Sequence, residues 1–69
     1  MNSISRIRAR LGVTQSALAT VLNVTQGNVS NYEHGQNMPP DVAKRLVRFA
    51  AKRKVRVTLD EIYSHIPSD

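Results

Sequence analysis

The helical spacing of apolar residues breaks at Asn23, between two short segments at 15–22 and 26–34. A threonine precedes each segment, and the side-chain oxygens of Thr14 and Thr25 suit the N-cap position of a helix. Asparagine is the non-glycine residue that most readily adopts the left-handed conformation, so Asn23 can form a tight turn. The sequence therefore predicts two short helices joined by a turn, and this unit constrains the fold more than any other feature.

Two short helices that cross at a steep angle need small residues where their backbones approach and apolar side chains at the contact. Ala19 supplies the small residue at the crossing, and Ala17 is also small enough for close approach. The apolar side chains expected at the contact are Leu18, Leu22, Val24, Val29 and Tyr32. With this contact formed, the outer face of the second helix stays free to enter the major groove of DNA.

Helix signals recur along the rest of the chain and predict three further helices, at about 3–11, 40–53 and 59–64. Ser3 can cap the first of them, and Thr58-Leu59-Asp60-Glu61 matches a capping box that opens the last. Helix ends are indicated by Gly12, Gly35 and Pro67. We therefore predict an all-α fold of five helices, in a single domain that covers residues 1–69.

The composition excludes several classes of protein. With 69 residues and no cysteine, the chain allows one domain that neither disulfides nor a zinc–thiolate cluster can stabilise. His34 and His65 lie far apart, and no carboxylate–histidine spacing indicates a metal site. No apolar run approaches the ~20 residues of a membrane span, and no signal peptide is evident. No nucleophile or cofactor motif indicates an enzyme, so we expect a cytoplasmic protein without metal, cofactor, membrane or small-molecule ligand.

Ten basic residues stand against five acidic ones, which gives a formal net charge of +5. This excess is typical of a protein with an anionic partner, and equally of a soluble basic protein. Lys44, Arg48 and Lys52 follow i, i+4 spacing and form one charged stripe. The stripe is either a solvated face or a direct DNA contact, and in both cases its positive potential speeds encounter with DNA.

The outer face of the predicted helix 26–34 carries the neutral amides of Gln26, Asn28 and Asn31. An amide holds both a donor and an acceptor, so it can form two hydrogen bonds with adenine in the major groove. The alternative is an ordinary solvated polar face, which the full helix-turn-helix pattern makes the weaker interpretation. Gly27 either lets the helix sit close to the bases or is a tolerated surface glycine.

Thr14, Gln15 and Thr25 lie at predicted helix N-termini, where backbone amides and side chains can hold phosphates. Capping alone can account for Thr14 and Thr25, and the two roles can coexist because the free amides still point outward. Gln15 is the better candidate for a phosphate contact.

The chain resembles the Cro/CI family of phage repressor-type helix-turn-helix proteins in Leu11-Gly12-Val13-Thr14-Gln15, Leu18-Ala19, Val24-Thr25-Gln26, Val29-Ser30 and Tyr32-Glu33-x-Gly35. The resemblance covers about residues 3–50, and the tail from Val57 is similar to that of short, Cro-like members. It implies the five-helix, lambda-repressor-like fold and a homodimer bound to a double-stranded DNA operator. Asn23 departs from the glycine that is commonest at the turn.

The resemblance also implies roles for single residues. Base contacts are expected from Gln26, Gly27, Asn28 and Asn31. Phosphate contacts are expected from Gln15, Thr25 and the loop around Asn37. Ala19, Asn23 and Val29 form the crossing of the two helices, and the resemblance suggests that Arg8 pairs with Glu33 to lock the first helix to the third.

The leading hypothesis is a sequence-specific transcriptional regulator, a Cro-like phage or prophage repressor that occupies a pseudo-palindromic operator as a dimer. The alternative is an antitoxin-type protein-interaction module with the same fold. Candidates for a mutual surface between two copies are Val55, Val57, Ile62, Tyr63 and Ile66. The same residues could instead close the core under the first helix.

Overall fold

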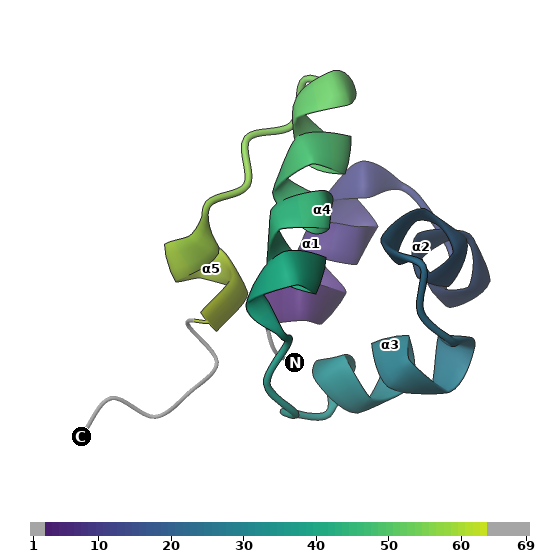
Figure 1. The fold of residues 1–69 in the computed structure, drawn as a ribbon. Helices are drawn as coiled ribbons and strands as arrows, with labels where there is room; N and C mark the ends of the chain where they lie inside the picture. Colours follow the sequence, from purple (N-terminus) through teal and green to yellow (C-terminus); the bar gives the residue numbers. More distant parts are fainter. Residues whose placement is uncertain (1–2, 64–69) are drawn as a thin grey trace.

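The computed structural model describes residues 3–63, and over this range the chain forms five α-helices and no strand (Figure 1). The helices are α1 Ser3–Leu11, α2 Gln15–Leu22, α3 Gln26–Glu33, α4 Pro40–Lys52 and α5 Leu59–Tyr63. The predicted all-α, five-helix fold is confirmed. In Figure 1, α4 runs through the middle of the molecule, with α2 and α3 on one side and α5 on the other.

The observed helix bounds differ from the predicted ones by single residues. α3 ends at Glu33 and α4 at Lys52, because His34 and Arg53 are C-cap residues with ψ near zero, at 8° and 7°. The predicted end of the last helix at Ser64 lies outside the described residues, as do His65 and Ile66.

Three threonine caps begin helices where the sequence predicts them. The Oγ1 atoms of Thr14 and Thr25 accept hydrogen bonds from backbone amides three residues later, both at 3.0 Å. Thr58 and Glu61 form the predicted capping box, because the Thr58 Oγ1 accepts from the Glu61 amide at 3.1 Å and the Glu61 Oε1 accepts from the Thr58 amide at 3.4 Å. Local chemistry therefore decides where these helices start.

Ser3 departs from the prediction of an N-cap. It is the first residue of α1 rather than the residue before the helix. Its Oγ donates instead to the carbonyl oxygen of Ile62, at 3.1 Å. The hydroxyl thus joins the two ends of the described chain, a contact that sequence spacing does not reveal.

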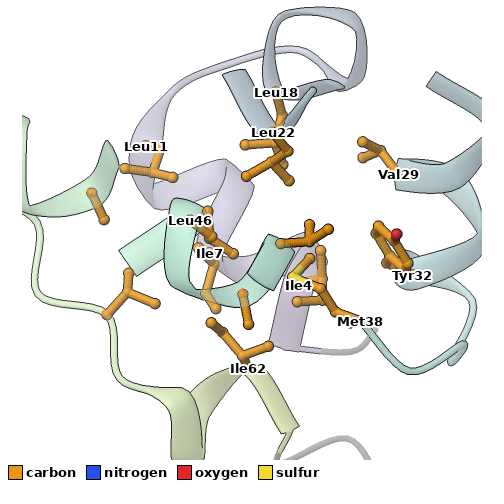
Figure 2. Close-up of a cluster of buried hydrophobic side chains, with 14 of the residues drawn as sticks. Ile4, Ile7, Leu11, Leu18, Leu22, Val29, Tyr32, Met38, Leu46 and Ile62 are labelled. Atoms are coloured by element: carbon orange, nitrogen blue, oxygen red, sulfur yellow. The ribbon is translucent and has the colours of Figure 1, made fainter. Parts of the chain in front are cut away.

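The core lies between the helices, and Figure 2 shows that all five contribute side chains to it. Its buried apolar residues are Ile4, Ile7, Leu11, Leu18, Ala19, Leu22, Val29, Tyr32, Met38, Val42, Ala43, Leu46, Ala50, Val57 and Ile62. Met38 reaches the core from the loop before α4. Ala17 is exposed, so of the two residues small enough for close approach only Ala19 is buried.

The segment after α4 closes the core. Val57 and Ile62 are 5% and 0% exposed, so these two candidates for a dimer surface are core residues of the protomer. The hydroxyl of Tyr63 donates to the carbonyl oxygen of Met38 at 2.7 Å, which ties α5 to the loop before α4. Arg10 of α1 reaches the same segment, where it pairs with Glu61 at 2.7 Å. None of the helices between residues 3 and 63 has the length and apolar character needed to cross a membrane.

Candidate nucleic-acid interface

The turn between α2 and α3 is centred on Asn23, whose backbone is left-handed, with φ 59° and ψ 45°. Beyond this residue the amide of Val24 donates to the carbonyl oxygen of Ala19 at 3.0 Å. Such a bond satisfies a carbonyl in the last turn of a helix, as in the Schellman motif. Asparagine can take this conformation in place of glycine because its side chain is short and polar. The turn therefore ends α2 and lets α3 start in a new direction (Figure 1).

α3 is anchored by two side chains on its inner face. Val29 is 0% exposed and Tyr32 is 3% exposed, and both point into the core in Figure 2. Gln26 and Asn31 lie elsewhere on the helix and are exposed. Because burial of Val29 and Tyr32 fixes how α3 is rotated, the two amides are held outward on a rigid support. Gly27, also exposed, adds no side chain to that surface.

Asn28 closes the first turn of α3. Its side-chain Oδ1 accepts from the amide of Thr25 at 3.2 Å and from the Oγ1 of Thr25 at 2.6 Å. The Oγ1 of Thr25 accepts from the Asn28 amide in return, which completes a capping box. Thr25 and Asn28 were predicted to contact phosphate and base respectively, and the structure first gives each of them a role in starting the helix.

Glu33 joins three helices through its carboxylate. Its Oε2 forms an ion pair with Arg8 of α1, and its Oε1 accepts from the Nε2 of Gln15 of α2 at 2.9 Å. Burial raises the pKa of Glu33, but the hydrogen bonds from Arg8 and Gln15, together with the positive charge of Arg8, outweigh burial and lower the pKa below its ordinary value. Arg8 also donates to the carbonyl oxygen of Val13 at 3.2 Å.

The position of Gln15 limits what its side chain can do. One N–H of its amide nitrogen donates to Glu33, a contact that sequence reasoning missed because it anticipated only the Arg8–Glu33 pair. The backbone amide of Gln15, at the first position of α2, remains a donor toward the outside. Gln15 can therefore offer a phosphate its backbone N–H and the second N–H of its Nε2.

A helix-turn-helix family model matches residues 4–49, which span α1 to α3 and most of α4. The matched family is of the Cro/C1 type. The chain belongs to this helix-turn-helix family. Its members are DNA-binding domains, and so is this one. No curated protein and no solved structure matches the chain.

The loop that follows α3 presents Asn37, the third residue expected near phosphate. Gly35 takes a backbone conformation that favours glycine, with φ 109°, and Met38 is 2% exposed. With its far end buried, the loop holds Asn37 exposed next to the end of α3. Asn37 is therefore on the surface of the helix-turn-helix protein, where its amide can meet the DNA backbone.

Arg45 supports the helix-turn-helix from α4 and was missed by sequence reasoning. Its Nη1 donates to the carbonyl oxygen of Leu22 at 3.0 Å, at the end of α2. A cation there interacts favourably with the negative end of the helix dipole. Its Nη2 also lies 3.8 Å from the Oδ2 of Asp41, one helical turn earlier in α4.

Exposed positive charge of the helix-turn-helix protein is carried by α4, whereas the exposed amides Gln26 and Asn31 are carried by α3. Glu33 is the charged residue of α3, and Arg8 pairs with it. The charged stripe predicted from i, i+4 spacing is exposed along α4, at Lys44, Arg48 and Lys52. The exposed amides of α3 are thus neutral groups within a basic protein.

Proposed function

We propose that the protein is a sequence-specific transcriptional regulator, a short Cro-like repressor of phage or prophage origin that occupies its operator in the cytoplasm. The observation that carries the proposal is the pair of exposed amides, Gln26 and Asn31, on a helix whose rotation is set by Val29 and Tyr32. Such a helix can enter the major groove and contact base edges there. Repression then needs no further chemistry, because a bound protein blocks the DNA that it covers.

Phosphate contacts orient the protein on the duplex in this proposal. The first amides of α2 and α3, at Gln15 and Gln26, point out of helix N-termini that attract anions. Thr25 contributes through its place at the N-cap, since its hydroxyl proton is already donated to Asn28. Asn37 completes the set from the loop after α3. These contacts fix register, and the side chains of α3 then decide which sequence is bound.

We further propose that two copies bind a pseudo-palindromic operator, because one domain of this size offers few contacts to DNA. The half-sites of such an operator lie about 34 Å apart, one helical turn of DNA. Of the candidates for the mutual surface that the structure describes, Val55 and Tyr63 remain, since they are only half-buried, and Ile66 lies outside the described residues. Leu59, which is 44% exposed, joins them as an apolar residue on the same segment.

Replacing Gln26 tests the base-reading function. On the operator selected from random duplexes, we expect Gln26→Ala to cost about 1–3 kcal/mol of binding free energy. On random DNA the loss should be much smaller, because a base contact adds little to non-specific binding. Titration of labelled duplexes at one fixed salt concentration measures both.

Lys52→Ala is the control, since Lys52 is an exposed cation on α4. It should lower both affinities by the same factor, as a general electrostatic contribution does. Equal losses for Gln26→Ala on both duplexes would reassign Gln26 to a phosphate contact. A single half-site that binds as tightly as the full inverted repeat would contradict the dimer.

A further inference from the structure

The orientation of the Asn28 side-chain amide is determined by its partners. The backbone N–H of Thr25 can only donate, so the Asn28 atom that lies 3.2 Å from it must be the oxygen. The hydroxyl of Thr25 accepts from the Asn28 backbone amide and directs its own proton to the same oxygen, at 2.6 Å. Two donors therefore occupy the acceptor end of this side chain.

The remaining end of the Asn28 amide is its Nδ2, which carries two N–H groups. Among residues 3–63 no hydrogen-bond partner of this nitrogen is found. Gln26 and Asn31 differ, because the side chains of both are exposed and keep a donor and an acceptor to offer. Asn28, which is half-buried, thus has donors alone left to offer, although its residue type is the same as that of the exposed Asn31.

We infer that Asn28 acts as a donor-only reader that selects guanine at one operator position, whereas Gln26 and Asn31 can pair with adenine. The inference rests on the proposed function, and it concerns only what α3 prefers in the groove. Guanine presents two neighbouring acceptors, O6 and N7. Thymine presents the single acceptor O4 beside its methyl group, adenine presents its N7 beside a donating amino group, and cytosine presents a donor. A group without a free acceptor is therefore matched best by guanine.

Asn28→Asp tests the inference, because it exchanges the donor for an acceptor and keeps the cap. One carboxylate oxygen can still accept from Thr25, while the other faces outward as an acceptor, which suits the amino group of cytosine. We expect selection from random duplexes to give guanine at one position with the wild-type protein and cytosine there with the variant. The change in preference between the two bases should be on the order of tenfold.

The preference for guanine over cytosine is measured separately for each protein. Repulsion between the new carboxylate and DNA weakens binding to both bases equally, so it does not affect this preference. Hydrogen exchange in the free protein provides a measurement without DNA. The amide of Thr25 should stay protected in Asn28→Asp and exchange faster in Asn28→Ala, which has no side-chain acceptor. A Thr25 amide that exchanges equally fast in all three proteins would overturn the donor-only orientation.

The selection separates failure of the inference from failure of the proposed function. Guanine that gives way to cytosine in Asn28→Asp supports the inference. The inference is overturned if the wild-type protein selects a defined operator with adenine at the position that responds to Asn28. It is also overturned if no Asn28 variant changes the selected sequence. Both results leave the proposed function as a sequence-specific regulator standing. The absence of any enriched sequence with the wild-type protein would overturn the operator-reading function, and the inference with it.

Discussion

Glu33 shows how much a single residue does in this protein. One carboxylate oxygen pairs with Arg8 and the other accepts from Gln15, so the side chain connects α1, α2 and α3. Its side chain is only 10% exposed, so both contacts are largely shielded from solvent. Loss of either partner would leave part of a charge buried without compensation, which is costly in a protein interior. The charged form of Glu33 therefore stabilises the packing of α1, α2 and α3 against one another.

We expect the free energy of unfolding to fall in acid as Glu33 becomes protonated. The pKa of Glu33 is lower in the folded protein than its ordinary value of 4.5. Its stabilisation is therefore complete above that value and is lost as the pH falls through the folded pKa. Glu33→Gln should cost about 1–2 kcal/mol at pH 7, where the charged hydrogen bonds are lost. Urea unfolding at pH 7 and pH 3 measures both effects.

The control is internal, because the other acidic residues are the same in both proteins. Between pH 7 and pH 3 the wild-type protein should lose more stability than Glu33→Gln, so the gap between the two narrows. Equal losses of unfolding free energy in the two proteins would show that the pKa of Glu33 does not differ between the folded and unfolded states.

At the scale of elements, the function depends on two short helices held at a fixed angle. Asn23 ends α2 in the left-handed conformation, Ala19 is buried at the crossing, and Arg45 binds the last carbonyl of α2. None of these residues lies on the outer surface of α3. They matter because a change in the crossing would move every amide of α3 together.

Substitution of Asn23 tests the turn. Asn23→Ala should destabilise the protein by about 1 kcal/mol, because a residue with a β-carbon is strained at positive φ. Asn23→Gly should be at least as stable as the wild type, since glycine has no such strain. Thermal unfolding of the three proteins gives the order. If alanine proves as stable as glycine, the left-handed turn is not the conformation in solution.

At the scale of the whole molecule, the core is closed by the segment after α4. α5 has only five residues, yet one of them, Ile62, is fully buried in the core. Contacts of Ser3 with Ile62 and of Arg10 with Glu61 bind α5 to α1, at the opposite end of the described chain. A domain of this size has a small core, so each buried side chain carries a large share of the stability.

Ile62→Ala should cost about 2–5 kcal/mol of unfolding free energy, because it leaves a cavity in the core. Leu59→Ala is the matched control on the same helix, since Leu59 is 44% exposed and its truncation removes little buried surface. Denaturant unfolding of both variants should give a large loss for the first and less than ~0.5 kcal/mol for the second. Similar losses of unfolding free energy in the two variants would show that Ile62 is not buried in the core as the structure has it.

Much of this fold could be predicted because its signals are local. A threonine cap needs only the amide three residues later, and a left-handed asparagine needs only its own backbone, so Thr14, Thr25, Thr58 and Asn23 take their predicted places. Helical spacing likewise identified Val29 and Tyr32 as the buried side of α3. For these features, the residues that interact are neighbours in sequence.

The remaining features depend on which distant segments meet. Three features join residues far apart in the chain: the burial of Met38 in the core, the bond from Arg45 to the carbonyl oxygen of Leu22, and the bond from Gln15 to Glu33. The spacing of residues in the sequence does not predict such contacts. The chemistry of Asn28 follows from the hydrogen bonds that it makes, since the sequence specifies an amide but not which end of it is occupied. Sequence alone determined the helices and their caps, because those energies are local. Only the tertiary structure decided which polar atoms remain free to meet DNA, because packing and competing partners use up the others.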